Sequence, residues 1–364
     1  MNRTEDILCK LLNAELWGEN FELEVTPQEL SSVLKVAEQQ TVFSLVFNSL
    51  AKSILRLDKN ILFHALIVQK NISLQNEQIN QEMVEFFKQM DMHQMNYIVM
   101  KGQTIAALYP HPEARMPGDV DFLIKENYEF AREKFRTWWG ISLPSKTKYE
   151  KDISFLRNRV NYEIHTFLIT FGSSKNSIYW NNLVLDSWSL NYYIDILGSK
   201  VRILPPTINA VYIFLHLFFH FVREGVGLRQ FCDWAVLLNY YYKEINVSQL
   251  KEILLKLGML KAYKALGTII VNNIGLHEDR FPFLLEVEDV KWGKKIFQDV
   301  IKCGNFGQNN HQIKHLGWRY KMETAYVALQ NVLKYYPLAS KDLGPYLFKC
   351  IKGNVILVLR SLVK

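Results

Sequence analysis

The sequence has few cysteines and no segment typical of secreted proteins. Its four cysteines lie far apart, without the paired spacing of a zinc site or the density of a disulfide scaffold: Cys9, Cys232, Cys303 and Cys350. Near the N-terminus, Glu5 and Asp6 stand where a secretory signal peptide needs positive charge before an apolar run. We therefore expect free thiols and a cytoplasmic protein.

The sequence also predicts no membrane span. The segment that most resembles one, Thr207 to Val222, is TINAVYIFLHLFFHFV, which has no charged residue but contains two histidines. It is shorter than the roughly 20 apolar residues that cross a bilayer. We predict a buried core helix here and no membrane span.

Several motifs of common enzyme classes do not occur. The sequence contains no Walker phosphate loop and no Gly-x-Ser-x-Gly nucleophile elbow. Gly225 and Gly227 lack the third glycine of a dinucleotide fingerprint, and they stand between two expected helices rather than after a strand. These absences argue against a P-loop NTPase, an α/β-hydrolase and a dinucleotide-binding dehydrogenase.

The composition is that of a globular protein. The 364 residues are 49% hydrophobic and 22% charged, which is enough for two or three compact units with a sizeable core. The net charge of +7 is spread along the chain rather than gathered in a basic arm. It fits a nucleotide, a nucleic acid or an anionic surface equally well, so the charge alone indicates no partner.

The hydrophobic pattern divides the chain into three parts. Residues 1–95 have helical spacing, and Thr26, Pro27 and Glu29 form a helix-start signal with a capping box. Residues 96–204 alternate short strands and helices, and residues 205–364 are helical again. We predict an α+β protein in which helical N-terminal and C-terminal segments flank a mixed-sheet core.

The middle part begins with a strand, a turn and a second strand. The segment NYIVM is rich in strand-forming residues, and Lys101-Gly102 after it indicates a turn. TIAALY then indicates a short helix. PHPEARMPG indicates a loop, which leads into the strand DVDFLI. Further on, DISFL and residues 159–168 indicate two strands that turn near Asn158. This order predicts a small sheet.

Two aspartates share one face of the strand DVDFLI. Side chains alternate along a strand, so Asp119, Asp121 and Leu123 point to the same side. The two carboxylates repel each other unless a hard cation lies between them, and oxygen ligands suit Mg²⁺ or Mn²⁺. The alternative is a surface strand with two solvated acids.

A third acid lies on the later strand, whose apolar face is formed by Val160, Tyr162, Ile164 and Leu168. Asn161, Glu163 and His165 then lie on the opposite face. Nucleotidyl transfer needs a carboxylate cluster that holds divalent cations at the attacking and leaving oxygens. Glu163 is therefore a candidate metal ligand or general base.

The segments YIVMKGQTIAALYPHPEARMPGDVDFLI and NYEIHTFL resemble the uncharacterised nucleotidyltransferase family of the polymerase-beta-like superfamily. The later segment NAVYIFLHLFFHFVREGVGLRQFCDWAVLL resembles the helical part of the same family. The resemblance covers about Tyr97 to Tyr242. It implies a turn glycine that holds triphosphate, an Asp-x-Asp strand that binds metal ions and a third acid on a later strand.

Carried over to this chain, the resemblance implies that Asp119, Asp121 and Glu163 are catalytic metal ligands and that Gly102 is the turn glycine. The usual Gly-Ser turn is absent, because Lys101 precedes the glycine and Gln103 follows it. Lys101 or the hydroxyl of Thr104 is a candidate to replace the serine contact. Two further residues are candidates for cofactor binding. Arg115 would neutralise phosphate charge, and its alternative role is that of an ordinary surface arginine. His165 would orient Glu163 or contact substrate, and its alternative role is that of a hydrogen-bonded structural histidine.

The expected activity is transfer of a nucleoside monophosphate from an NTP to an acceptor hydroxyl, with Mg²⁺ or Mn²⁺ as cofactor. ATP is the first candidate for the NTP. The acceptor stays open between a small molecule, a protein and an RNA end, and the oligomeric state stays open as well. One alternative is an inactive module of the same fold that binds a nucleotide or a partner. The other is a metal-dependent hydrolase built on His216 and His220.

Arg229 and Asp233 are four residues apart in an expected helix, so we predict an ion pair between them within that helix.

Overall fold

The computed structural model describes residues 2–19, 24–51, 59–145, 151–305 and 318–349. Within these residues, the N-terminal part is helical: α1 (Arg3–Trp17), α2 (Pro27–Gln39), α3 (Phe43–Ala51) and α4 (Lys59–Met92). Helix α2 begins as predicted, because the Thr26 hydroxyl accepts a hydrogen bond from the Glu29 amide, and the Glu29 carboxylate accepts one from the Thr26 amide.

A four-stranded mixed sheet follows. Its strands are β1 (Tyr97–Met100), β2 (Val120–Ile124), β3 (Asp152–Arg157) and β4 (Val160–His165), in the order β1-β2-β4-β3. Strands β2 and β4 are parallel and the two outer pairings are antiparallel. The α+β prediction with a mixed sheet is therefore confirmed.

Short helices connect the strands: α5 (Gly102–Ala106), the 3₁₀ turn η1 (Pro112–Ala114) and α6 (Tyr128–Trp139). Helix α6 begins at the Asn127 cap and lies in the crossover that the parallel pair β2 and β4 requires. Strands β3 and β4 turn at Asn158 and Arg159, which both have positive φ angles of 47° and 68°. The predicted hairpin with its turn near Asn158 is confirmed.

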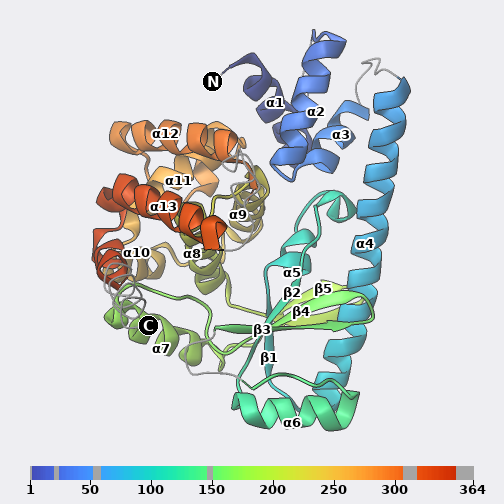
Figure 1. The fold of residues 1–364 in the computed structure, drawn as a ribbon, viewed down its shortest axis with the longest axis vertical. Helices are drawn as coiled ribbons and strands as arrows, with labels where there is room; N and C mark the ends of the chain where they lie inside the picture. Colours follow the sequence, from blue (N-terminus) through green and yellow to red (C-terminus); the bar gives the residue numbers. More distant parts are fainter. Residues whose placement is uncertain (1, 20–23, 52–58, 146–150, 306–317, 350–364) are drawn as a thin grey trace.

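Helix α4 covers one face of this sheet. It runs along one side of the molecule (Figure 1), and its Phe86 ring packs against the rings of Phe122 on β2 and Tyr162 on β4, with centroids 5.9 and 4.8 Å away. Side chains alternate along a strand, so Asp121 and Glu163 must lie on the opposite face. The long helix therefore fixes which face of the sheet is apolar.

The hairpin of β5 (Tyr192–Ile196) and β6 (Ser199–Ile203) was not predicted from the sequence. It turns at Leu197 and Gly198, where the Asp195 carboxylate accepts a hydrogen bond from the Gly198 amide at 2.9 Å. Strand β6 packs against β1, and α7 (Ser174–Ser187) precedes the hairpin.

The C-terminal part is helical, as predicted. It contains α8 (Pro206–Arg223), α9 (Leu228–Tyr241), α10 (Val247–Leu257), α11 (Leu260–Asn272), the turn η2 (Glu278–Arg280), α12 (Val287–Cys303), α13 (Trp318–Tyr335) and the turn η4 (Tyr336–Leu338). Almost every side chain of α8 is buried, so this segment is the predicted core helix. Among the described residues, no helix combines the length and the apolar composition needed to cross a membrane.

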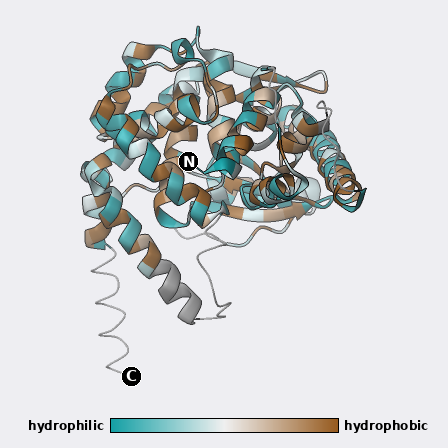
Figure 2. Cartoon of the chain, turned by 90° about the horizontal axis from the view of Figure 1, so that it is seen from above, coloured by the Kyte–Doolittle hydropathy of each residue, from teal (hydrophilic) through white to brown (hydrophobic). Residues whose placement is uncertain are grey.

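One cluster of buried apolar side chains joins the three parts, with Leu12, Phe122 and Trp234 among its members. Hydrophobic and hydrophilic residues alternate along the helices around it (Figure 2), as expected when each helix buries one face. The boundaries after residues 95 and 204 lie next to the end of α4 and the start of α8. The division into domains at these boundaries stays a prediction.

The thiols of Cys9, Cys232 and Cys303 are free, in agreement with the prediction, whereas Cys350 lies outside the described residues.

Candidate nucleotide and metal site

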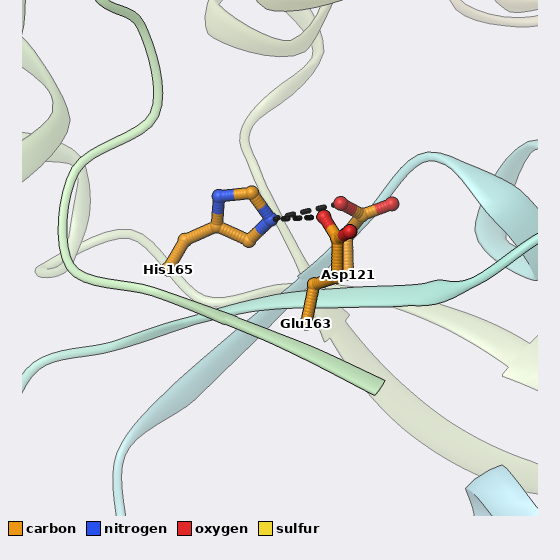
Figure 3. A group of neighbouring side chains, drawn as sticks. All are labelled: Asp121, Glu163 and His165. Atoms are coloured by element: carbon orange, nitrogen blue, oxygen red, sulfur yellow. Dashed lines mark hydrogen bonds and ion pairs between the residues drawn. The ribbon is translucent and has the colours of Figure 1, made fainter. Parts of the chain in front are cut away.

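Asp121 and Glu163 are neighbours across the parallel strands β2 and β4. They are Cα partners in the register, so their side chains emerge side by side from the same face of the sheet. Figure 3 shows both carboxylates directed toward one ring nitrogen of His165. The side chain of Asp121 is 9% exposed and that of Glu163 is 28% exposed. Two carboxylates held this close repel each other, which favours a cation between them.

His165 lies two residues after Glu163 on β4 and is completely buried. Its Nε2 is 2.8 Å from Asp121 Oδ1 and 3.5 Å from Glu163 Oε2. Ligand atoms of Asp121, Glu163 and His165 all lie within 4.8 Å of one another, which is a spacing that can hold a metal ion. His165 thus belongs to the acidic cluster itself.

Lys101 supplies a positive charge to this cluster. Its Nζ lies 2.9 Å from Asp121 Oδ1, and its side chain is only 15% exposed. Burial by itself would raise the pKa of Asp121, but the Lys101 ammonium and the His165 hydrogen bond outweigh it and hold that pKa below the usual range. Asp121 is therefore ionised at neutral pH.

The turn after β1 places Lys101 in the site through an uncommon backbone conformation. Lys101 has a φ of 54° and Gly102 a φ of 47°, a region that side chains disfavour. A Cβ atom at Gly102 would lie 3.2 Å from the backbone oxygen of Asp119, so the glycine permits the close approach of turn and strand. Strain of this kind is often kept where a side chain must be aimed at a functional site.

The turn departs from the family pattern in a defined way. Gln103 stands where a serine was expected, but its amide points to α4, where Nε2 donates to Asn80 Oδ1 at 2.7 Å. The Thr104 hydroxyl donates to the Lys101 carbonyl at 2.7 Å, and Thr104 is 2% exposed. Of the two candidates to replace the serine contact, Lys101 is the one directed at the acids.

Asp119 lies just before β2, outside the group of three that can hold a metal ion. Partial burial raises its pKa above the ordinary value, and the negative charges of Glu163 and Asp121 raise it further. A raised pKa in one of the three acids agrees with the expectation from their mutual repulsion. The charges of the cluster therefore affect the pKa of Asp119, although Asp119 is not one of the three residues that can hold a metal ion.

Arg115 lines the same cavity as the acids, but its guanidinium is paired with Asp233 rather than with the acidic cluster. Its Nε and Nη2 donate to the two carboxylate oxygens of Asp233 on α9 at 2.7 and 2.8 Å, and Arg115 is 3% exposed. The Tyr109 hydroxyl donates to the same carboxylate at 2.7 Å. Asn76 on α4 donates to the Arg115 carbonyl at 2.8 Å. The loop before β2 is thus fixed between α4 and α9.

The predicted ion pair between Arg229 and Asp233 within one helix is wrong. Asp233 pairs with Arg115 instead, because a buried bidentate pair satisfies both carboxylate oxygens. Arg229 donates through Nη1 to the Met116 carbonyl at 3.0 Å. It therefore provides a second contact between α9 and the same loop.

A cavity of about 550 Å³ joins these groups. Six of the candidate residues from the sequence line its walls: Lys101, Gly102, Arg115, Asp119, Asp121 and Glu163. The other two candidates, Thr104 and the buried His165, lie outside this lining. The volume is in the range of small-ligand sites in proteins, roughly 300–1,000 Å³. Carboxylates, two lysines and histidines converge on one cavity large enough for a small ligand.

The family assignment follows from a match over most of the chain. Residues 26–272 match the model of a family described as "Uncharacterised nucleotidyltransferase". The chain belongs to this family. The match includes the turn, both acid-bearing strands and the helices α8 and α9 that close the cavity.

Comparison with other proteins adds little to the nucleotidyltransferase assignment. No curated protein matches the chain. Among solved structures, the chain is similar to an antigenic nucleotidyltransferase-like protein from Paracoccidioides brasiliensis at 11% sequence identity and a TM-score of 0.36. That similarity covers 59% of this chain and 97% of the other.

The same cavity is lined by residues that the sequence analysis did not single out or left open. Asp152 is the Cα partner of His165 across β3 and β4 and lines the cavity. The two-residue turn at Asn158 and Arg159 fixes this pairing, so the register could have revealed Asp152.

His216 and His220 on α8 line the cavity as well. Burial lowers the pKa of His216 below its ordinary value, and Lys101 lowers it further, so the ring is neutral at pH 7. His220 Nδ1 lies 2.9 Å from Glu224 Oε2. Within the described part of the chain, neither histidine belongs to a group of three metal-ligating side chains, so the geometry does not favour the zinc-hydrolase alternative.

Proposed function

We propose that this protein is a divalent-metal-dependent nucleotidyltransferase that transfers a nucleoside monophosphate from an NTP to an acceptor hydroxyl. ATP is the first candidate for the NTP. The acceptor oxygen bonds to the α-phosphorus, the bond from that phosphorus to the bridging oxygen breaks, and pyrophosphate leaves. The observation that supports this proposal most is the register that makes Asp121 and Glu163 direct neighbours on one sheet face.

The residues present fit a hard divalent cation. Asp121 and Glu163 offer carboxylate oxygens on the cavity side of the sheet, and Asp119 offers another at the cavity edge. A bound Mg²⁺ or Mn²⁺ would neutralise phosphate charge and polarise the phosphoryl group. The ionised state of Asp121 prepares this site for a cation at neutral pH.

Lys101 has the position and charge to bind phosphate oxygens once a cation compensates Asp121. Its Nζ already lies at the cavity wall, 2.9 Å from Asp121, and a lysine is a common phosphate ligand. Glu163 is the candidate to take the proton of the acceptor hydroxyl, because its side chain is the more exposed of the central acids. Arg115 would act indirectly, by holding the loop before β2.

The test is transfer of label from α-³²P-labelled ATP, CTP, GTP or UTP to the small-molecule, protein and RNA fractions of a cell extract. With Mg²⁺ or Mn²⁺, the protein should label one fraction and release pyrophosphate. Asp121→Asn should reduce transfer by roughly 1,000-fold, as expected when a metal ligand is lost. Asp6→Asn is the matched control, because Asp6 also pairs with a lysine, Lys10, but on the surface of α1.

Three outcomes separate the possibilities. Metal-dependent transfer that Asp121→Asn removes supports the proposal. Nucleotide binding without transfer to any fraction would favour an inactive binding module, and equal transfer by the wild type and Asp121→Asn would contradict the assignment of the site.

A further inference from the structure

The acidic cluster contains a nitrogen ligand that the three-carboxylate pattern does not provide. The closest group of metal-ligating atoms comprises Asp121, Glu163 and His165, while Asp119 lies outside it. We propose that His165 is a direct ligand of the bound cation through Nε2, oriented by Asp152, and that this gives the site a preference for Mn²⁺ or Co²⁺ over Mg²⁺. This inference rests on the proposed function, because it concerns the cation of the same site.

The geometry around Nε2 is that of a shared ligand position. Nε2 lies 2.8 Å from an oxygen of Asp121 and 3.5 Å from an oxygen of Glu163, and Figure 3 shows both carboxylates turned toward it. A side chain that only hydrogen-bonded Asp121 would not need a second carboxylate next to the same nitrogen. Three ligand atoms gathered at one point are what a metal ion needs.

The other ring nitrogen provides an independent argument. Nδ1 is buried and has no hydrogen-bond partner among the described residues, although buried polar atoms are nearly always paired. The closest acid to it is Asp152, whose Oδ2 is 3.9 Å away, directly across the strand pair. A histidine that binds a metal through one nitrogen usually donates its other N–H to a carboxylate.

The present contacts and the metal-bound arrangement differ in the position of one proton. As a hydrogen-bond donor to Asp121, the ring carries its proton on Nε2 and leaves Nδ1 unpaired. As a metal ligand, it presents the Nε2 lone pair and carries the proton on Nδ1, directed at Asp152. An approach of roughly 1 Å would bring Nδ1 and Asp152 to hydrogen-bond distance. Asp152 is therefore a positioning residue for His165.

A nitrogen ligand changes which metal binds best. Mg²⁺ prefers oxygen ligands only, whereas imidazole suits transition metals, and affinity increases from Mn²⁺ to Co²⁺. Replacing a carboxylate by an imidazole also lowers the negative charge of the ligand set, which weakens the electrostatic attraction for Mg²⁺. The site should therefore discriminate against Mg²⁺ more than three carboxylates would.

The experiment uses the full chain with MnCl₂, CoCl₂ or MgCl₂ alone, without nucleotide. Calorimetric titration gives the affinities, and pulsed EPR of the Mn²⁺ complex detects magnetic coupling to a directly bound ¹⁴N nucleus. His165→Gln is the informative variant, because its amide can still donate to Asp121 but is a poor metal ligand. His277→Gln is the matched control, because His277 also contacts an aspartate, Asp279, through Nδ1 at 2.6 Å but is exposed.

We expect wild type and His277→Gln to bind Mn²⁺ more tightly than Mg²⁺ and to show nitrogen coupling. His165→Gln should lose the coupling and bind Mn²⁺ at least 10-fold more weakly, with less than a 3-fold change for Mg²⁺. Asp152→Asn should keep the coupling and weaken Mn²⁺ binding about 10-fold, in the range for residues that orient a ligand.

Mn²⁺ bound without nitrogen coupling in the wild type, or coupling retained in His165→Gln, would overturn the inference, and so would the absence of metal binding. These readouts do not depend on turnover. A protein that binds Mn²⁺ through His165 but transfers no nucleotide would contradict the proposed function and leave this inference standing.

Discussion

Two charged clusters line the same cavity, and they differ in how their charges are balanced. Around Asp233, the guanidinium of Arg115 and the hydroxyl of Tyr109 together donate to both oxygens of the carboxylate. Around Asp121, a second carboxylate lies in register, and Lys101 is the ammonium in direct contact. The first cluster is balanced by the protein, and the second has an excess of negative charge.

This difference separates a structural role from a functional one. A carboxylate whose oxygens are all paired within the protein has no place for a ligand, so the Asp233 cluster fixes the loop before β2 in position. A cluster with unbalanced carboxylates at a cavity wall is costly without a cation. A bound cation would offset this cost, so we propose a functional role for Asp121 and a structural role for Asp233.

The largest expected stability change follows from breaking the balanced cluster. Arg115→Met leaves the Asp233 carboxylate buried without its cation, which should lower the free energy of unfolding by about 3–5 kcal/mol. Urea denaturation followed by circular dichroism measures this loss. Arg132→Met is the control, because the exposed Arg132 pairs with Glu129 on the surface of α6, and such pairs contribute below about 1 kcal/mol.

The double variant Arg115→Met/Asp233→Leu sharpens this test. Replacing both charges by apolar groups removes the unpaired carboxylate and should recover a large part of the lost stability. If Arg115→Met were no less stable than Arg132→Met, the pair would not be structural.

The next expected effect concerns Lys101, which competes with a cation for Asp121. Lys101→Met removes an ammonium 2.9 Å from the carboxylate, so MnCl₂ alone should bind about 10-fold more tightly. Binding of the metal–NTP complex should weaken by a similar factor, because a phosphate ligand is lost. Calorimetric titration of both ligands measures these opposite changes.

Lys10→Met, in the exposed pair with Asp6, is the control and should change neither affinity. An unchanged Mn²⁺ affinity in Lys101→Met would show that the lysine and the cation do not compete.

The smallest expected effect is the pH dependence of stability at Asp119. Its folded-state pKa is raised above the unfolded value of about 3.9, so ionisation opposes folding above that value. Asp119→Asn removes this cost at neutral pH and should raise the melting temperature of the metal-free protein by about 1–2 °C after allowance for solvent screening.

This gain should shrink as the pH falls through the folded-state pKa and should vanish below about 3.9, where the carboxyl group is protonated in both states. Thermal melts between pH 3 and pH 8 check the trend. A gain that persisted at low pH would exclude electrostatic repulsion as its cause.

The sequence predicted the parts of the fold that local chemistry determines. The capping box at Thr26, the turn at Asn158 and the alternation along both acid-bearing strands depend on neighbouring residues, and all are present in the structure. These local rules were enough to bring Asp121 and Glu163 to one face.

The partners of buried charged groups could not be predicted in the same way. The spacing of Arg229 and Asp233 allows an ion pair within α9, but Arg115 approaches from a loop more than 100 residues earlier in the chain and offers a bidentate contact. Such contacts follow from tertiary packing, which the spacing of residues along the sequence does not predict.

We propose that Asp121 and Glu163 together hold the cation to which a nucleotide binds. Calorimetric titration of a non-hydrolysable ATP analogue, with and without Mg²⁺ or Mn²⁺, tests it directly. We expect the metal to raise nucleotide affinity at least 10-fold in the wild type and to leave it unchanged in Asp121→Asn and Glu163→Gln. An equal metal effect in the wild type and both variants would contradict it.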